Sequence, residues 1–473
     1  MVGNDSLTIW GGLYLFFQYL ILAYFVLVSA SYTLLTYLGL RSILRYNRVM
    51  SSYAIKPLLE SQAYRAISIL VPAYNEEKSI IASVRSLLSL HYPVFEIIVV
   101  SDGSRDGTVD VLREAYHLTE ISLTRYHMTI NAKPIKRLFR SVNYPNLILV
   151  EKENGGKADA LNVALNLARY PLVCSVDADS TLDVQALLRT AYLFVEDETV
   201  VAVGGTVRPL NGAIIQDGQL VEVRLPPTWI ERLQIVEYSR AFFAGRAGWA
   251  EIGILMIISG AFGVFKRESV LAVGGYRTNT VGEDMDLVMR LHKYYLRHKL
   301  PYQIRFTPDP LCWTEVPSDL KTLRRQRNRW HRGLWENLWE HRDMLFNPRY
   351  GLVGLVGVPY AWLVEAASPA VELGGYVFFL LSILLGILNL EFTFYFMSLA
   401  ILFGLVLSLM SIGIETLLLN RYKRISDRLI FIVAACVEFL GYRQILLWER
   451  FRASFQVWGK RGQWGSMERK GFR

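Results

Sequence analysis

Two aspartates one residue apart are the side chains of this chain best placed to do chemistry. Asp177 and Asp179 end the stretch LVCSVDADS, residues 172–180. A continuous apolar run followed by polar residues predicts a strand buried on both faces, as in a parallel sheet covered by helices. Ligands bind beyond the carboxyl ends of such strands, and paired carboxylates suit a divalent cation such as Mg²⁺ or Mn²⁺. The same short pattern also occurs in ordinary turns, so other features of the chain must decide between the two.

Other acidic residues stand where strands or helices are predicted to begin or end. Asp102 opens a turn after the strand predicted at residues 96–100. Glu283, Asp284 and Asp286 fall in the first turn of a predicted helix. A helix N-terminus favours negative charge whatever its function, so this acidic cluster is open to both a structural and a chemical interpretation.

Strand and helix patterns alternate along the part of the chain that holds these residues. Strands are predicted at residues 67–71, 96–100, 147–150, 173–176 and 200–204, and helices at 76–90, from 108 onward, at 158–167, 184–195 and 230–243. The alternation predicts an α/β fold with a mostly parallel sheet and helical crossovers. Residues 117–144 break the alternation and are predicted to form a basic insertion or surface flap.

The ends of the chain are apolar enough to enter a membrane. The chain has 473 residues, 52% of them hydrophobic, and its length predicts two or three domains. Residues 10–40 carry no charge and exceed the roughly 20 residues needed to cross a bilayer. No small-residue cleavage site follows, which predicts a retained anchor. The basic residues after it, Arg41, Arg45, Arg48 and Lys56, place residue 41 onward in the cytoplasm.

The C-terminal part contains two clear candidate spans and two doubtful ones. Residues 363–388 and 392–419 are long enough to cross, whereas 351–362 is rich in glycine and 429–447 contains charged side chains. The basic tail predicts a cytoplasmic C-terminus, so an even number of crossings must follow residue 350. Three or five crossings in all result, and the basic residues between 421 and 428 favour three.

Basic residues alternate with tryptophan after residue 318. Ser318 is the expected N-cap of a helix that carries Trp330, Trp335 and Trp339 among arginines. The pattern predicts an amphipathic helix lying in the membrane interface. Base stacking on the tryptophans is the nucleic-acid alternative, but nothing else in the chain supports it. The net charge of +9 is therefore assigned to membrane lipids, and no nucleic-acid partner is expected.

Seven short motifs occur in a fixed order over residues 66–332. They are VPAYNEE, SDGS, NGGKADALN, VDADS, SGAF, GEDMDL and QRNRW. Each is weak by itself, but together they resemble the membrane-embedded family-2 glycosyltransferases of the processive type, the cellulose, hyaluronan and poly-N-acetylglucosamine synthases. The resemblance implies a cytoplasmic GT-A-like domain, the nucleotide-diphospho-sugar transferase fold, with transmembrane and interfacial helices beside it.

The predicted domain organisation follows from the motifs and the apolar segments. It comprises an N-terminal transmembrane helix (1–41), a linker (42–64), a GT-A-like glycosyltransferase domain (65–317), an amphipathic interface helix with QxxRW (318–350), a C-terminal membrane region with two or four crossings (351–450) and a basic cytoplasmic tail (451–473).

The resemblance also implies how a UDP-sugar donor would be bound. Tyr74 would face the uracil ring, Glu76 and Asp102 would accept hydrogen bonds from the ribose or base, and Lys157 would pair with the diphosphate. Asp179 is the preferred metal ligand and Asp177 the second, holding Mg²⁺ or Mn²⁺ against the phosphates. The full set of donor-binding candidates is Pro72, Tyr74, Glu76, Asp102, Lys157, Asp177, Gln326 and Arg329.

Asp284 matches the aspartate that serves as general base in the family, and Asp286 is the competing candidate. This chain has GED where cellulose synthases have TED, which leaves the acceptor contacts open. One base without a second nucleophile indicates inversion in a single displacement. The candidates for acceptor binding are Gly260, Glu283 and Trp330.

The predicted function is that of an inverting, metal-dependent hexosyltransferase. It would move a hexose or N-acetylhexosamine from a UDP-sugar to a growing β-linked polysaccharide at the bacterial-type inner membrane and export the product. Addition of one sugar to a membrane lipid is the first alternative, and a scaffold with an inactive transferase domain is the second. Three or five crossings are few for a polymer channel, so a homo-oligomer or an export partner is also considered.

Overall fold

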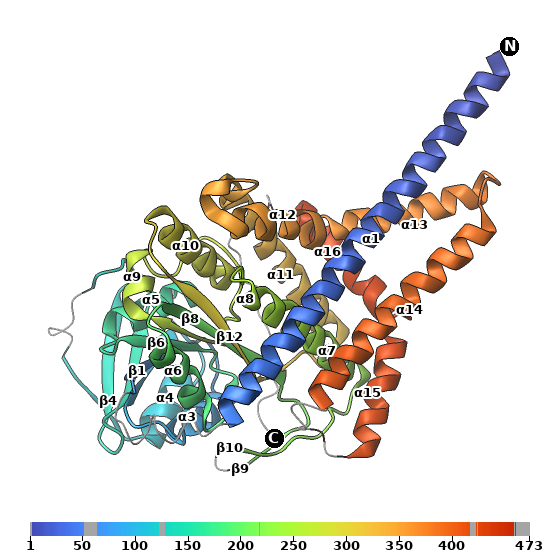
Figure 1. Cartoon of the computed structure of the whole chain (residues 1–473). Helices are drawn as coiled ribbons and strands as arrows, with labels where there is room; N and C mark the ends of the chain where they lie inside the picture. Colours follow the sequence, from blue (N-terminus) through green and yellow to red (C-terminus); the bar gives the residue numbers. More distant parts are fainter. Residues whose placement is uncertain are drawn as a thin grey trace.

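An α/β body and a group of long helices make up the molecule (Figure 1). The computed structural model describes residues 2–51, 64–122, 128–216, 218–416, 422, 424–457 and 459. Helix α1, Val2–Ser51, runs along the body and continues beyond it, next to α13, Ser368–Leu384, and α14, Leu390–Ile414 (Figure 1). The molecule therefore has an α/β body and a helical part that projects away from it.

One large sheet forms the centre of the body. Among the described residues it has ten strands in the order β3-β4-β5-β2-β1-β6-β11-β8-β12-β7. Strands β3, β5, β2, β1, β6, β8 and β12 run in one direction and β4, β11 and β7 in the other, so the predicted mostly parallel sheet is confirmed. The strands are β1 Ile67–Ala73, β2 Phe95–Asp102, β3 Leu118–Glu120, β4 Ile135–Ser141, β5 Leu147–Lys152, β6 Leu172–Val176, β7 Ser180–Leu182, β8 Val200–Pro209, β11 Phe262–Lys266 and β12 Gln303–Thr314, with β9 Ile214–Gln216 and β10 Gln219–Glu222 as a separate pair.

Helices connect and cover these strands. Every residue of β6 is buried, as expected for an apolar strand in the middle of a sheet with helices on its faces. The helices of the body are α3 Ile80–Leu88, α4 Thr108–Ala115, α5 Lys157–Leu167, α6 Ala186–Glu196, α7 Trp229–Ser239, the π-helix η2 Arg240–Arg246, α8 Ala247–Glu251, α9 Arg267–Ala272 and α10 Glu283–Arg297. The helix predicted at 76–90 is shorter than expected because Glu76 and Ser79 form a turn closed by a hydrogen bond between their side chains.

The predicted basic flap at 117–144 is partly sheet. Strands β3 and β4 lie there and extend the edge of the sheet next to β5, while residues 123–127 lie outside the described part. Leu138 and Phe139 are buried, and Arg137 pairs across the strands with Glu151 at 2.6 Å. Apolar residues inside a basic segment were the signal for a strand, and the prediction gave too much weight to the charge.

The N-terminal helix is longer than the predicted span. It continues to Ser51, ten residues into the segment 42–64 that was predicted to be a linker, and residues 52–63 lie outside the described part. No glycine or proline interrupts residues 41–51, and Ile43 is buried against Phe243 and Ile414. Packing against the body therefore extends the helix beyond its membrane segment.

Two helices are long and apolar enough to cross a membrane, Tyr14–Met50 and Leu390–Ile414. Two bent pairs raise the total to at most four among the described residues: Val353–Ala366 with Ser368–Leu384, bent by 41°, and Ile425–Val437 with Tyr442–Gln456, bent by 55°. The chain is a membrane protein by these segments. Five crossings would need residues 351–362 as a separate span, whereas the structure joins them to α13.

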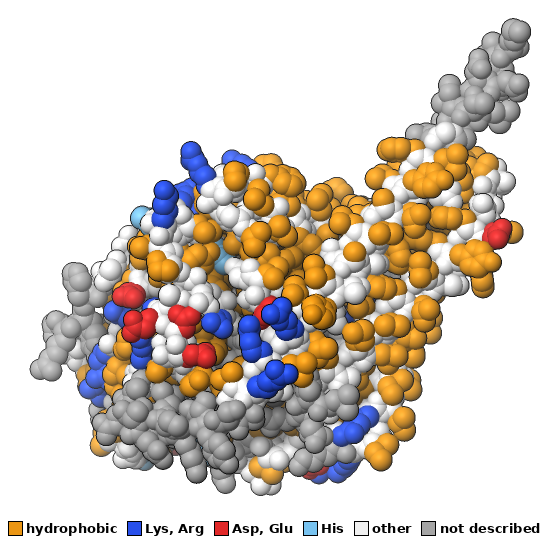
Figure 2. Space-filling model, in the orientation of Figure 1, with side chains coloured by type: hydrophobic (Ala, Val, Ile, Leu, Met, Phe, Trp, Pro, Cys, Tyr) orange, Lys and Arg blue, Asp and Glu red, His pale blue; other side chains and the backbone are white. Residues whose placement is uncertain are grey.

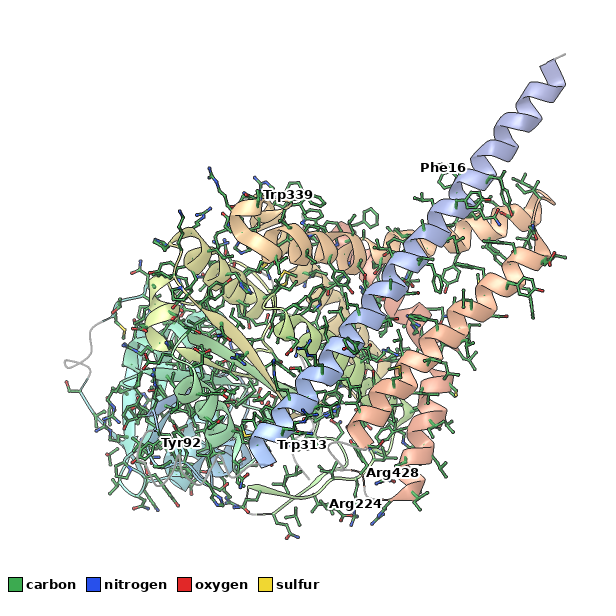
Figure 3. The ribbon with its side chains drawn as sticks, in the orientation of Figure 1. Phe16, Tyr92, Arg224, Trp313, Trp339 and Arg428 are labelled. Carbon is green, nitrogen blue, oxygen red and sulfur yellow. The ribbon has the colours of Figure 1, made fainter. Side chains whose placement is uncertain are left out.

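The surface agrees with this division. Hydrophobic side chains cover α14 and the neighbouring part of α1, whereas charged side chains gather over the body (Figure 2). Phe16 is 60% exposed on the projecting part of α1, while Trp313 of β12 is 1% exposed inside the body (Figure 3). Aromatic residues thus serve as core in one part and as an apolar outer surface in the other.

The helix predicted to lie in the membrane interface also packs against other helices of the protein. It is α11, Leu320–Glu340, and its N-cap is Asp319 instead of Ser318, since the Asp319 carboxylate accepts the Thr322 N–H at 2.9 Å. Arg327 pairs with Glu237 of α7 at 2.8 Å. The helix contacts α16 over much of its length, so its basic residues had partners in distant segments. The remaining C-terminal elements are η3 Arg342–Met344, η4 Pro348–Tyr350, η5 Val353–Gly357, α12 Val358–Tyr360, η6 Ala361–Ala366, α15 Ile425–Val437 and α16 Tyr442–Gln456.

Candidate functional site

The two aspartates of the VDADS motif face a large cavity at the edge of the sheet. Asp177 follows β6 directly, and Asp179 lies between β6 and β7. Both line a cavity of about 1270 Å³, together with Lys157 and Asp284. Strands β2, β1 and β6 are parallel neighbours, so their carboxyl ends meet at this edge, where ligands of α/β proteins bind.

Lys157 connects three elements around Asp177. It is the first residue of α5, and Gly156 before it has φ 91°, a conformation that glycine adopts without strain. The ammonium lies 2.5 Å from Asp177 Oδ1 and 3.5 Å from Glu283 Oε1, and it donates to the Gly260 carbonyl at 3.3 Å. Burial by itself would lower the pKa of Lys157, but the neighbouring carboxylates raise it, so the side chain is charged at neutral pH.

Gly260 forms part of the cavity wall because it has no side chain. A Cβ at this position would come within 2.9 Å of Lys157 Nζ, which is too close. Its amide donates to Asp284 Oδ2 at 3.2 Å. The predicted acceptor residue therefore contributes backbone groups and space between Lys157 and Asp284.

Asp179 is the more enclosed member of the aspartate pair. It is 8% exposed and accepts a hydrogen bond from Thr314 Oγ1 at 3.3 Å. In the described part of the chain, no group of three or more His, Cys, Asp or Glu side chains could hold a metal ion. Asp177 and Asp179 thus offer two carboxylates, and further ligands of a cation would have to come from substrate or water.

Asp102 lies at the end of β2, where three donors reach its carboxylate. Lys152 Nζ is 2.6 Å from Asp102 Oδ1 and 2.6 Å from Asp159 Oδ1. The amides of Gly155 and Gly156 donate to the two oxygens of Asp102 at 2.9 and 2.7 Å. Lys152 is 0% exposed, so the Asp102 carboxylate is held by one buried cation and two amides.

Sequence analysis missed Lys152 and Asp159. A lysine at the end of a buried strand and an aspartate in the first turn of the next helix were the available signals. Neither shows that the two side chains meet at Asp102, because β2, β5 and α5 come together only in the folded sheet.

The remaining predicted donor residues lie beside Asp102. Pro72 is in β1, Tyr74 follows the strand and is 46% exposed, and Glu76 is 6% exposed. The Glu76 carboxylate accepts from Ser79 Oγ at 2.6 Å. Pro72, Tyr74, Glu76 and Asp102 are not among the described residues that line the large cavity, and the loop 155–157 connects the two places.

The acidic cluster of α10 separates into three different environments. Glu283 is 4% exposed, and burial followed by the charge of Asp284 raises its pKa to about 7, against the opposing effect of Lys157. Asp284 faces the cavity, and its oxygens accept the amides of Gly260 at 3.2 Å and Met285 at 2.8 Å. Its orientation is therefore fixed while part of the carboxylate faces the cavity.

Asp286, the competing candidate for the base, is 0% exposed. It accepts from Arg290 Nε at 2.7 Å, and its other oxygen lies 3.0 Å from His341 Nε2. Burial alone would raise the pKa of Asp286, but the hydrogen bond from His341 and the charge of Arg290 lower it. The structure places Asp286 in a link between α10 and α11, away from the described cavity lining.

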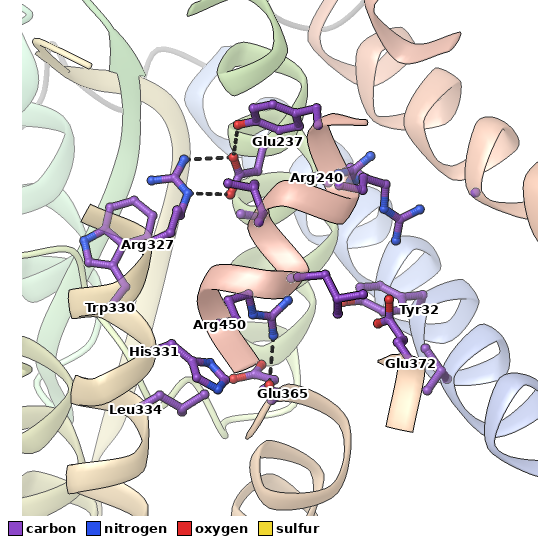
Figure 4. Close-up of a pocket in the computed structure, with 18 of the residues that line it drawn as sticks. Tyr32, Glu237, Arg240, Arg327, Trp330, His331, Leu334, Glu365, Glu372 and Arg450 are labelled. Atoms are coloured by element: carbon purple, nitrogen blue, oxygen red, sulfur yellow. Dashed lines mark hydrogen bonds and ion pairs between the residues drawn. The ribbon is translucent and has the colours of Figure 1, made fainter. Parts of the chain in front are cut away.

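The QxxRW residues of α11 form another wall of the cavity. Gln326 and Arg329 line it, and Trp330 is 44% exposed with the Arg327 guanidinium 4.1 Å from its ring centroid. Arg327 is itself held by Glu237 of α7 (Figure 4). Burial lowers the pKa of Arg329, while the charges of Glu283, Asp177 and Asp284 oppose this shift.

The cavity extends from these residues toward the membrane helices. Arg450 and Glu365 line it beside His331 of α11, and Tyr32 and Glu372 line it on the far side of Arg450 (Figure 4). Arg450 Nη2 donates to the Glu365 carbonyl at 2.8 Å, where η6 meets α13. One continuous space therefore joins the sheet edge to helices α1, α13 and α16.

Comparison with known proteins identifies the family. The model described as Glycosyl transferase family 2 matches residues 68–233, and the model described as Glycosyl transferase family group 2 matches residues 172–414, more than half of the chain. The chain belongs to the family-2 glycosyltransferases. The predicted family and enzyme class are thereby confirmed, and the residues of the seven motifs lie within the matched segments.

Two curated relatives of the transferase are poly-beta-1,6-N-acetyl-D-glucosamine synthases. The one from Staphylococcus epidermidis is 28% identical over 274 residues, 58% of this chain and 56% of the relative. The one from Staphylococcus aureus strain COL is 29% identical over 278 residues, 59% of this chain and 57% of the relative. The transferase thus aligns with little more than half of each relative.

A solved structure supports the fold of the transferase. The mannosyltransferase PcManGT from Pyrobaculum calidifontis, in complex with GDP-Man and Mn²⁺, is 20% identical with a TM-score of 0.51. The similarity covers 88% of this chain and 99% of that one. It supports the GT-A-like fold inferred from the sheet, and at this identity it says nothing further about activity.

Proposed function

We propose that this transferase moves a hexose or N-acetylhexosamine from a UDP-sugar to a growing β-linked polysaccharide. One observation carries the proposal: Lys157, Asp177 and Asp284, from three separate elements, line the same cavity as Trp330. A cationic group for a diphosphate, carboxylates for a metal, a base and an aromatic platform are the parts that sugar transfer needs. Their convergence supports an active transferase and disfavours an inactive scaffold.

Donor recognition would be divided between the cavity and the neighbouring sheet edge. Lys157 and Arg329 would bind the diphosphate, because both are cationic and line the cavity. Tyr74, half exposed after β1, would stack on the uracil ring, and Asp102 would accept a hydrogen bond from the nucleoside. The loop 155–157 connects the two places, so a nucleotide extended along this loop would reach both.

Asp177 and Asp179 fit a divalent cation that the donor helps to hold. Among the described residues no third acidic or His side chain completes a metal-binding group with these two, and two carboxylates suit Mg²⁺ or Mn²⁺, which keep positions for phosphate oxygens and water. Such an ion would neutralise charge on the departing UDP. The mannosyltransferase of similar fold was solved with Mn²⁺, which agrees with this assignment.

Asp284 would act as general base. It would accept the proton of an acceptor hydroxyl as that oxygen attacks the anomeric carbon and the bond to UDP breaks. The products would be UDP, a protonated Asp284 and a new β-glycosidic bond, with inversion at the anomeric carbon. Trp330 would place the acceptor sugar by contact with its ring face.

The size of the cavity favours a polymeric acceptor. Small-molecule sites usually have about 300–1,000 Å³, and this cavity, with about 1270 Å³, continues along α1, α13 and α14. A polysaccharide leaving the site could follow it through the membrane. The basic end of α1, with Arg41 and Arg45, would place the body in the cytoplasm at the inner membrane.

The test is incubation of membranes holding the full chain with radiolabelled UDP-N-acetylglucosamine and UDP-glucose, with Mg²⁺, Mn²⁺ or EDTA. UDP-N-acetylglucosamine is tested first because the curated relatives are named for that sugar. We expect UDP release and a long, alkali-stable product that a β-specific glycosidase digests. A label extracted into organic solvent after one addition would indicate the lipid acceptor, and absence of UDP release would contradict the proposal.

A further inference from the structure

Arg246 is a fixed cation beside the proposed acceptor site. It ends η2, a π-helical segment between α7 and α8, and such segments are frequent at functional sites. Its guanidinium lies 4.0 Å from the centroid of the Phe242 ring, and Phe242 in turn stacks on Phe306 at 6.2 Å. Because Phe242 is buried, the guanidinium has a rigid support.

One nitrogen of this guanidinium lacks a partner. Arg246 Nη1 is buried and has no hydrogen-bond partner among the described residues. Arg240, at the other end of the same π-helix, bonds to Ser408 Oγ at 2.6 Å and pairs with Glu438. A buried donor without a partner costs about 1–3 kcal/mol, and more if charged, so its retention calls for an explanation.

The position of Arg246 indicates which ligand is missing. It lines the same cavity as Asp284 and Trp330 on the catalytic side and Glu365 on the membrane side. Burial lowers the pKa of Arg246 to about 10, against the charges of Asp284, Tyr238 and Glu365, so it is still cationic at neutral pH. Asp284 and Glu365 are both close enough to Arg246 to act on its charge, so the side chain lies near residues of both sides of the cavity.

The charges nearby favour a neutral ligand. Asp284 and Glu365 lie near the guanidinium, and Arg329 and Arg450 lie near these two carboxylates, so the group is close to charge balance without a charged ligand. Sugar hydroxyl, ring and amide oxygens accept hydrogen bonds without adding charge. The occupant would therefore be an uncharged saccharide instead of a lipid phosphate.

We propose that Arg246 donates a hydrogen bond to the sugar behind the acceptor terminus and so forms a second acceptor subsite for a neutral saccharide chain. The inference rests on the proposed function, and it narrows that function to acceptors of at least two sugars. Arg246 positions the chain so that its terminal hydroxyl meets Asp284, and it has no part in donor binding.

The experiment compares wild type with Arg246→Met and Arg246→Lys in detergent-solubilised full chain. Acceptors are β-linked N-acetylglucosamine oligomers of one to five sugars, with UDP-N-acetylglucosamine as donor. In wild type, the acceptor KM should fall sharply from one sugar to two. In Arg246→Met, the KM for acceptors of two sugars should rise by about 10- to 100-fold, toward the KM for one sugar, as expected for loss of a hydrogen bond to a charged group. In Arg246→Lys, this KM should lie between the values of wild type and Arg246→Met.

Arg232→Met is the matched control. Arg232 also lies over an aromatic ring, Trp229 at 5.2 Å, but it is not among the described residues that line the cavity. Its acceptor KM should equal that of wild type. Donor KM and acceptor-independent UDP release should be unchanged in every variant, which shows that the donor side is intact.

Three results would overturn the inference. The first is an acceptor KM in Arg246→Met that falls from one sugar to two as it does in wild type. The second is a rise in donor KM as large as the rise in acceptor KM. The third is a loss of activity only when a polyprenyl phosphate is the acceptor. Size-exclusion chromatography identifies misfolded protein. If Arg246→Met is misfolded, the acceptor KM of Arg246→Lys tests the inference. Failure of the wild type to release UDP would instead contradict the proposed function, so the two failures are distinguishable.

Discussion

The proposed donor edge, around Asp102, and the proposed acceptor mouth, around Trp330, are built in opposite ways. At the donor edge, Asp102 has Lys152 and two amides as partners, and Lys152 is shared with Asp159. At the acceptor mouth, Trp330 is 44% exposed and Arg246 Nη1 has no partner among the described residues. The charged groups at the donor edge already have partners within the protein, whereas the acceptor mouth has an exposed aromatic ring and a donor without a partner.

The difference agrees with the two ligands proposed above. A nucleotide sugar is the same molecule in every cycle, so a prearranged set of donors and acceptors binds it at low reorganisation cost. A growing chain must move by one sugar per cycle, so its contacts have to be few and exchangeable. The following predictions test whether the donor edge is rigid and the acceptor mouth adaptable.

The largest effect is expected for Asp284→Asn at the acceptor mouth. The amide cannot accept the acceptor proton, so transfer should fall by about 10²- to 10⁴-fold while UDP binding persists. Label incorporation and calorimetric titration with UDP measure the two effects. Asp110→Asn, an exposed acid on α4, is the control, and loss of UDP binding in Asp284→Asn would remove the assignment of the base.

Lys152→Met should damage the donor edge in both stability and binding. It leaves Asp102 and Asp159 buried without their cation, which should cost about 3–5 kcal/mol of unfolding free energy. Donor KM should rise while acceptor KM stays constant. Denaturation in detergent measures the unfolding free energy, and titration with the donor measures its KM. Lys133→Met, at an exposed lysine, is the control. A change in acceptor KM alone would contradict the assignment of Lys152 to the donor edge.

Asp286→Asn should weaken the scaffold without changing the chemistry. Its partners Arg290 and His341 are interior, so the unfolding free energy should fall by about 1.5–3 kcal/mol. The kcat of the folded fraction should remain that of wild type, in contrast to Asp284→Asn. Activity per folded molecule checks this, and a loss of kcat equal to that of Asp284→Asn would return Asp286 to the list of candidate bases.

The smallest effect concerns the pH dependence of stability. Burial raises the pKa of Glu283 from 4.5 to about 7, so the folded state holds a proton that the unfolded state has lost. The stabilising effect of this proton is complete below pH 4.5 and disappears as the pH rises toward 7. The fall in Tm between pH 4.5 and 7 should be smaller in Glu283→Gln than in wild type. Equal falls would show that Glu283 does not titrate there.

Much of the fold could be predicted because its signals are local. The apolar run before Asp177 and the alternation of strands and helices depend on neighbouring residues, and the five predicted strands are all present. The long apolar segments predicted membrane helices for the same reason. The length of α1 was predicted incorrectly, and the ion pair of Arg327 in α11 with Glu237 was not predicted, because both depend on packing against distant parts of the chain.

By itself, the sequence determined the family, the order of the motifs and the residue types available for chemistry, since these depend on composition and spacing alone. Only the tertiary structure decided that Asp284 faces the cavity while Asp286 is buried, that Lys152 holds Asp102, and that Arg246 lines the same cavity as Asp284. These relations join residues from separate strands and helices. They exist only after the sheet has assembled, because local propensity does not specify contacts between distant segments.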